Sequence, residues 1–359
     1  MSVQKRPNGT WRARILGPDG KERARHFPTR AAAKRWEAEQ LAARERGQFI
    51  DPSNTATVTE YARAWAASRP HRTGTAQRTE SMIAHHIEPT ALGKRRLSAV
   101  RPSEVQAWAT DRSTVLAPST MRLLLALMRS VFNSAVLDRL VAISPVVRIQ
   151  LPDYKPDEIV PLTPQQVKAF ADAVPARCRA MIVAQAGLGL RLSEVLGLRA
   201  VDIRFLERVV KIEVQRDRHT MKLVAPKTAR SRRSIPLPKV VADELAQHIA
   251  TYPPAADGAI FTMDNGEPWK QNNVQRGVVL PGVEKAGLPP GTTSHDLRHA
   301  YAAWLLMAGE SVIVVAERLG HADATMVLRT YSRIMPDQED RTRKAIDQLW
   351  SQNADPKAI

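Results

Sequence analysis

Hydrophobic and polar residues follow a period of two near the start of the chain and a helical period afterwards. Turn-forming sequences, Asn8-Gly9 and Pro18-Asp19-Gly20, separate three short stretches that are predicted to be strands: Val3–Arg6, Thr10–Leu16 and Lys21–Phe27. Thr29 can then cap a helix over Ala31–Arg46, which Gly47 would end. Residues 1–50 are therefore predicted to form a small three-stranded sheet with one helix packed on it.

The same alternation sorts the side chains of these strands by face. Arg12 and Arg14 fall on the face opposite to Ala13, and Arg23 and Arg25 share one face of the third strand. We expect the helix to cover the apolar face. All four arginines are then predicted to lie together on the open face of the sheet, toward a partner or toward water.

From residue 55 to residue 147 the apolar positions follow the spacing of helices. The longest predicted helix, Ser119–Leu140, has an apolar stripe typical of a protein core, which comprises Met121, Leu124, Leu125, Met128, Val131, Phe132 and Ala135. Residues 148–161 are rich in proline and charge and are predicted to be a linker.

A third region, residues 162–349, begins at Thr163-Pro164, where an N-cap precedes a proline at the first helical position. Helices are predicted on both sides of a β segment, whose strands are Val209–Val214, Lys222–Ala225 and Arg233–Pro236. Residues 350–359 are left as a tail. The expected fold class is mainly α with small β-sheets (α+β).

The charge of the chain indicates a polyanionic partner. Its 359 residues have a formal net charge of +17, and residues 1–50 alone hold 12 Lys or Arg against 5 Asp or Glu. Basic side chains bind nucleic acid by releasing its counterions. No apolar run approaches the roughly 20 residues of a membrane span, no signal core begins the chain, and its single cysteine excludes an internal disulfide framework. We therefore expect a cytoplasmic DNA- or RNA-binding protein without a membrane partner.

The third region also contains the residues that suggest chemistry. Arg191 follows a glycine-rich turn at the start of a helix, where a cation weakens the helix but can meet an approaching anion. Glu194, three residues later, could hold its guanidinium in position. Lys227 is expected in a turn between two strands, within the basic sequence PKTARSRR.

Two further segments complete this group. His295 and Arg298 in HDLRHA are neighbours on one helix face, and His321 precedes Tyr331 by ten residues. Arginine forks suit phosphate oxygens, and a tyrosine can form a covalent intermediate. The set predicts a phosphodiester under attack by the phenol of Tyr331. Arg191 and Arg298 would neutralise its charge and Lys227 would protonate the leaving oxygen, with no metal or other cofactor required.

These four segments, in this order, resemble the catalytic domain of the tyrosine recombinases, the phage integrase family. The resemblance implies two phosphate-binding arginines (Arg191 and Arg298), a general-acid lysine of a β-hairpin (Lys227), an acid/base histidine (His295), a phosphate-donating histidine (His321) and the nucleophile Tyr331. It also implies an arm-type DNA-binding domain over 1–50, a core-binding domain over 55–147 and a mixed α/β catalytic domain over 162–349.

The function that the resemblance implies is integration, and excision as well, of a phage or other mobile-element genome through a 3′-phosphotyrosine intermediate. The partners would be double-stranded DNA with core-type and arm-type sites, and a homotetramer of the chain on a Holliday junction. A host DNA-bending protein and an excisionase are further candidate partners. The reaction would occur in the cytoplasm of a bacterial host, at the nucleoid.

Three alternatives remain open at this stage. The His-x-x-x-His spacing of His295 and His299, with Asp296 between them, is typical of a zinc metallohydrolase helix. A DNA-binding regulator without catalysis would explain the charge, and a type IB topoisomerase would use similar chemistry. His299 is interpreted as an ordinary helix histidine, and Tyr301, the rival nucleophile, as a core residue because it lies in an apolar stretch.

Overall fold

The computed structural model describes residues 2–17, 20–45, 51, 55–70, 73–154, 159–226, 228–321, 323–332 and 338–352. The chain divides into two compact units, Met1–Pro156 and Asp157–Ile359. This division falls inside the predicted linker 148–161. The finer boundaries, including the separation of 1–50 from 55–147, stay predictions.

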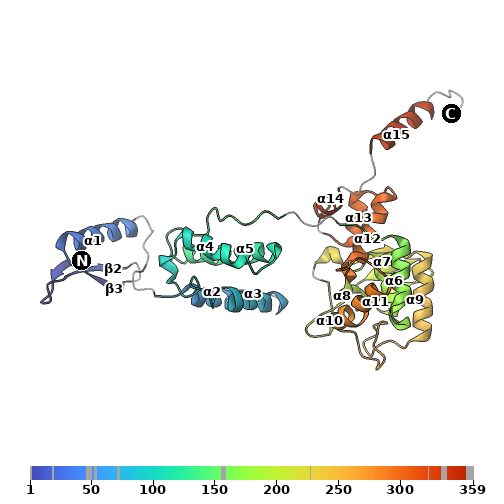
Figure 1. The fold of residues 1–359 in the computed structure, drawn as a ribbon, viewed down its shortest axis with the longest axis horizontal. Helices are drawn as coiled ribbons and strands as arrows, with labels where there is room; N and C mark the ends of the chain where they lie inside the picture. The colour runs from blue at the N-terminus through green and yellow to red at the C-terminus, as the bar shows by residue number, and fades with distance from the viewer. Residues whose placement is uncertain are drawn as a thin grey trace. The chain divides into compact units, whose positions relative to one another are not determined.

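The first unit begins with an antiparallel sheet of order β1-β2-β3, formed by Ser2–Lys5, Trp11–Leu16 and Glu22–Phe27. Helix α1 (Arg30–Glu45) packs on one face of it (Figure 1), and Thr29 Oγ1 accepts a hydrogen bond from the Ala32 N–H at 3.2 Å. A small core joins sheet and helix and consists of Ala13, Ile15, Ala33 and Trp36. The predicted Pro18-Asp19 turn and Gly47 helix end lie outside the described residues.

The strand register corrects one prediction about this sheet. Arg23 pairs with Ile15 and Arg25 with Ala13, so both share the helix-covered face, while Arg12 and Arg14 lie on the open face. The four arginines Arg12, Arg14, Arg23 and Arg25 therefore do not share a face. The alternation of side chains within each strand was predicted correctly. However, the register between β2 and β3 decides which face of one strand lies on the same side as a given face of the other. A shift of the register by one residue would reverse this match.

The rest of the first unit is helical, with α2 (Val58–Ala67), α3 (Thr73–His86), a 3₁₀ turn (Leu97–Ala99), α4 (Pro102–Ser113) and α5 (Pro118–Leu137). All seven residues of the predicted apolar stripe of α5 are buried, as the spacing indicated. Among the described residues, α5 is also the one helix whose length and composition would suffice to cross a membrane. Its stripe packs in the core of this unit against the other helices.

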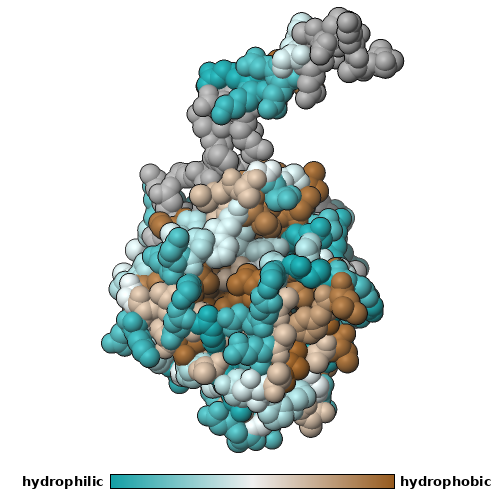
Figure 2. Space-filling model, turned by 90° about the vertical axis from the view of Figure 1, so that its right-hand side faces the viewer, coloured by the Kyte–Doolittle hydropathy of each residue, from teal (hydrophilic) through white to brown (hydrophobic). Residues whose placement is uncertain are grey.

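The second unit surrounds its core with helices, and one face of it carries hydrophobic residues in separate patches among hydrophilic ones (Figure 2). The helices are α6 (Pro164–Ala173), α7 (Ala176–Leu188), α8 (Leu192–Val195), α9 (Lys239–Thr251), α10 (Gln271–Val274), a π-helical turn (Gln275–Val279), α11 (Leu280–Lys285), α12 (Ser294–Met307), α13 (Val312–Leu319), α14 (Thr325–Tyr331) and α15 (Gln338–Gln352). Helix α15 continues past the predicted tail boundary at residue 350.

Two small sheets accompany these helices. Strands β4 (Ile203–Arg204), β5 (Val209–Ile212) and β8 (Arg233–Pro236) form one, and β6 (Gln215–Arg216) and β7 (Leu223–Val224) form a separate hairpin. Strands β7 and β8 belong to different sheets. Lys227 itself lies outside the described residues.

Candidate active site

Arg191 is the N-cap residue of α8, and Glu194 in the first turn of that helix holds it in place. The Glu194 carboxylate accepts the Arg191 backbone N–H at 3.0 Å and its guanidinium Nη1 at 2.8 Å. It also accepts Nη1 and Nη2 of Arg233 from β8, at 3.1 and 2.9 Å. Burial alone would raise the pKa of Glu194, but the two arginines outweigh it and hold that pKa below its ordinary value. Glu194 therefore binds Arg191, as the sequence predicted, and it also binds a second arginine, Arg233.

Arg298 is buried and held by backbone carbonyls at the ends of two helices. Its Nη1 donates to the Gly189 carbonyl and its Nη2 to the Leu319 carbonyl, both at 2.6 Å. Carbonyls at helix C-termini lack intrahelical partners and carry the negative end of the helix dipole, so they suit a cation. Burial, together with the charge of Arg191, lowers the pKa of Arg298 to about 9, and it stays protonated at neutral pH.

Glycines end both of those helices in the left-handed region, with φ +63° at Gly189 and +65° at Gly320. A Cβ at Gly189 would lie 2.3 Å from Cδ1 of Tyr301, so the ring of Tyr301 packs directly on this turn. Tyr301 is 9% exposed in an apolar cluster, which supports its assignment to the core.

His321 follows Gly320 directly and contacts Arg298, while Arg191 contacts Gly320. Its Nε2 lies 3.1 Å from Nη2 of Arg298, and Arg191 Nη2 donates to the neighbouring Gly320 carbonyl at 3.3 Å. Burial and the charges of Arg298 and Arg191 lower the pKa of His321 to about 4, so the ring is neutral. If Nε2 accepts from Arg298, the proton of the ring is on Nδ1. Among the described residues, this buried Nδ1 has no hydrogen-bond partner.

Tyr331, the last residue of α14, lies next to His299 of α12. Its hydroxyl is 2.5 Å from His299 Nδ1, and the two rings meet edge to face with centroids 5.7 Å apart. Burial raises the pKa of Tyr331 to about 12. His295 lies one turn earlier on α12, with its ring 4.6 Å from that of His299. Partial burial of the ring, together with the neighbouring His299 and Arg298, lowers its pKa.

The described part of the site thus joins Arg298 to His321 by a direct contact, places Arg191 on the carbonyl of Gly320, the residue before His321, and joins His295 to Tyr331 through His299. His299 was interpreted from the sequence as an ordinary helix histidine, and the structure places it against Tyr331. No role was assigned to Arg233 from the sequence, although the period-2 alternation of β8 places it on the same face of the strand as the core residue Ile235.

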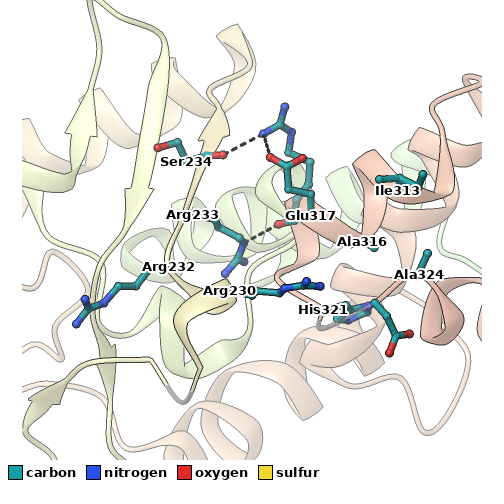
Figure 3. Close-up of a pocket in the computed structure, with 11 residues that line it drawn as sticks. Arg230, Arg232, Arg233, Ser234, Ile313, Ala316, Glu317, His321 and Ala324 are labelled. Atoms are coloured by element: carbon teal, nitrogen blue, oxygen red, sulfur yellow. Dashed lines mark hydrogen bonds and ion pairs between the residues drawn. The ribbon is translucent and has the colours of Figure 1, made fainter.

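A pocket of about 550 Å³ opens beside this cluster. Figure 3 shows its labelled residues on two sides: Arg230, Arg232, Arg233 and Ser234 around β8, and Ile313, Ala316, Glu317, His321 and Ala324 around α13 and the turn after it. Arg233 Nε donates to the Arg318 carbonyl at 2.6 Å and so ties the strand to the end of α13. The pocket does not include Tyr331, but His321 and Arg233 connect it to the cluster. Its lining is basic because four arginines outnumber the carboxylates of Glu317 and Asp323.

The geometry speaks against the zinc alternative. Asp296 caps α12, because its carboxylate accepts the N–H and the hydroxyl of Thr293 at 2.7 and 2.8 Å. Within the part of the chain that the structure describes, no group of three or more His, Cys, Asp or Glu side chains could hold a metal ion. Guanidinium groups occupy the centre of the cluster instead. The arrangement suits a phosphate anion beside a phenol.

Comparisons with known proteins point in the same direction. The sequence model described as "Phage integrase family" matches residues 161–337. The integrase of Mycobacterium phage D29 is 27% identical over 331 residues, which cover 88% of this chain and 86% of that protein.

Solved structures resemble the fold. The Tn1549 transposon integrase, in complex with a circular intermediate DNA, superposes with a TM-score of 0.71 at 25% identity and covers 82% of this chain and 99% of its own. Lambda integrase, solved as a dimer on a core site and as a tetramer on a Holliday junction, gives a TM-score of 0.61 at 18% identity and covers 94% and 95%.

Proposed function

This chain belongs to the phage integrase family, and we propose that its cluster of arginines, histidines and one tyrosine carries out the cleavage and rejoining of DNA by this site-specific tyrosine recombinase. The observation that carries the proposal is the pairing of a buried tyrosine with a neutral histidine, in a site that also holds Arg298 on two helix-terminal carbonyls and Arg191 on Glu194 and the Gly320 carbonyl. The set offers a nucleophile and anion-binding groups in the same small region.

In the proposed mechanism, a DNA phosphate binds next to Arg191, Arg298 and His321. The two guanidinium groups offset the charge that grows on the nonbridging oxygens, and His321 is assigned a hydrogen bond to one of them from the resemblance. Tyr331 Oη attacks phosphorus, the bond from phosphorus to the 5′ oxygen breaks, and a 3′-phosphotyrosine forms. Lys227 is assigned the protonation of the departing 5′ oxygen, and His295 an acid/base contact, both from the resemblance.

Rejoining reverses these steps with the 5′ hydroxyl of another strand. The energy of the phosphodiester is kept in the tyrosine linkage, so the proposed reaction needs no ATP and no metal. Two strand exchanges through a four-way junction require four active tyrosines, so we propose a homotetramer on DNA. Lambda integrase, whose fold this chain shares, was solved as such a tetramer.

DNA binding is proposed for both units. The basic pocket beside His321 suits backbone phosphates next to the cleaved one. In the first unit, the helices α2 to α5 are proposed to bind core-type sites and the small sheet to bind arm-type sites. Arg12 and Arg14 on the open face of the sheet are its proposed DNA contacts. Arg23 on the covered face forms an ion pair with Asp51 at 2.6 Å, which fits a structural role better.

The cellular context follows the same proposal. We propose that the chain integrates and excises a phage or mobile-element genome in the bacterial cytoplasm, with a DNA-bending protein and an excisionase as accessory partners.

Covalent capture tests the proposed chemistry even though the sequence of the attachment site is unknown. A pool of nicked duplexes with randomised sequence around the nick is incubated with the protein in EDTA and without ATP. The short product beyond the nick diffuses away after cleavage, so the adduct accumulates and can be sequenced. The proposal predicts adducts with a common sequence. Absence of adducts from the whole pool would contradict it.

A further inference from the structure

The hydroxyl of Tyr331 has one specific polar neighbour among the described residues, His299. The 2.5 Å contact with Nδ1 joins two helices, α12 and α14, across 32 positions of sequence. Tyr331 is 3% exposed, so water cannot readily replace the histidine as the acceptor of its proton. His295, one turn away, contacts the ring of His299.

We propose that His299 is a further catalytic residue, which accepts the phenolic proton of Tyr331 when the tyrosine attacks DNA. This inference rests on the proposed function. As the bond from Tyr331 Oη to phosphorus forms, the proton moves to Nδ1 of His299. As the bond from phosphorus to the 5′ oxygen breaks, that oxygen takes a proton from the general acid assigned to Lys227. Rejoining returns the proton from His299 to the phenol.

The protonation states around this pair fit the role. The groups that face His299 are His295, Asp296 and Arg298 of its own helix and Tyr331 of α14. Burial lowers the pKa of His299, and Arg298 adds to this while Asp296 opposes it. The ring is therefore neutral at neutral pH and its Nδ1 lone pair can accept a proton. Because the pKa of Tyr331 is raised to about 12, very little phenolate exists without such a base.

The test uses full-length protein and a duplex recovered from the randomised nicked pool. Single-turnover cleavage is measured for the wild type, for His299→Asn and for the control His219→Asn, which changes an exposed histidine of the β6–β7 turn. Asparagine can still hydrogen-bond near the position of Nδ1 but cannot take up a proton. General acid–base catalysis contributes about 10²- to 10⁴-fold, so His299→Asn should cleave at least about 100-fold more slowly. The control should match the wild type.

The dependence on pH separates proton transfer from positioning. Without the base, hydroxide must ionise the phenol, so the His299→Asn rate should rise about tenfold per pH unit while the wild-type rate stays level above neutral pH. A 5′-phosphorothiolate substrate, whose leaving group needs little protonation, should rescue Lys227→Ala and leave His299→Asn slow. Cleavage by His299→Asn within threefold of the wild type, a constant deficit at every pH, or rescue by the phosphorothiolate would overturn the inference.

A measurement on the wild type covers the case in which His299→Asn fails to fold. In ¹⁵N-histidine spectra at neutral pH, the inference predicts that His299 carries its proton on Nε2 and accepts a hydrogen bond at Nδ1. A proton on Nδ1 would overturn it. If wild-type protein forms no adduct with any duplex, the proposed function itself fails, which is a different result from normal cleavage by His299→Asn.

Discussion

Replacing Glu194 by glutamine tests how Arg191 and Arg233 are held in place. The side chains of Glu194 and Arg233 are only 1% and 4% exposed, and the carboxylate also accepts two hydrogen bonds from Arg191. Breaking a buried ion pair by changing one partner costs about 3–5 kcal/mol. Glutamine keeps one acceptor oxygen but turns an amide toward a guanidinium, so we expect the lower end, about 3 kcal/mol.

The expected effect is large enough to measure by calorimetry. In a unit of roughly 200 residues each kcal/mol shifts Tm by about 2–4 °C, so Glu194→Gln should lower the Tm of the second unit by about 6–12 °C at pH 7. The matched control is Glu207→Gln, which breaks the surface pair of Glu207 with Arg204. Exposed pairs contribute about 0–1 kcal/mol, so this control should shift Tm by less than about 4 °C.

The pH dependence has a definite sign. The pKa of Glu194 is lower in the folded protein than in the unfolded chain, so its contribution is complete above the unfolded pKa of about 4.3 and is lost as the pH falls through the folded value. The difference between the wild type and Glu194→Gln should therefore shrink on acidification below about pH 4. A Glu194→Gln protein that unfolds within the range of Glu207→Gln at pH 7 would show that the buried carboxylate does not hold the two arginines in place.

Three further changes test other parts of the molecule. Lys227→Ala should slow cleavage of an ordinary phosphodiester severely, with recovery on a 5′-phosphorothiolate; equal impairment on both substrates would make Lys227 a phosphate contact instead. The double variant Arg12→Ala/Arg14→Ala should weaken binding to arm-type DNA and flatten the salt dependence of that binding, measured by fluorescence anisotropy. Both effects should be larger than in the double variant Arg23→Ala/Arg25→Ala. The opposite ranking would contradict the assignment of Arg12 and Arg14 to the open face. Gly189→Ala, which places a Cβ 2.3 Å from the Tyr301 ring at a φ of +63°, should lower the unfolding free energy by about 1–3 kcal/mol in thermal denaturation, and an unchanged Tm would contradict the close packing.

Local patterns in the sequence predicted those features that depend on one element at a time. The stripe of α5 follows from helical spacing alone, and the cap of α6 follows from Thr163, whose Oγ1 accepts the Gln166 N–H. The hydrogen bond between Arg191 and Glu194 joins residues three positions apart, so it could also be predicted from the sequence.

Features that depend on how distant elements meet were not visible. The faces of Arg23 and Arg25 depend on the pairing of β3 with β2, which the strands' own alternation does not fix. The contact of His299 with Tyr331 joins two helices, and spacing within α12 could only place His299 near His295. The carbonyls of Gly189 and Leu319 that hold Arg298 lie 109 and 21 positions away in the sequence.

The proposed function depends above all on Tyr331 as the nucleophile, and mass spectrometry of the covalent adduct identifies the nucleophile directly. Wild-type protein is trapped on the selected nicked duplex, then digested with nuclease and protease, and the peptide that carries the nucleotide is sequenced. We predict a 3′-phosphate linkage on Tyr331, no adduct in Tyr331→Phe, and an unchanged adduct in Tyr301→Phe if that protein folds. An adduct on Tyr301, or one that persists in Tyr331→Phe, would contradict the assignment.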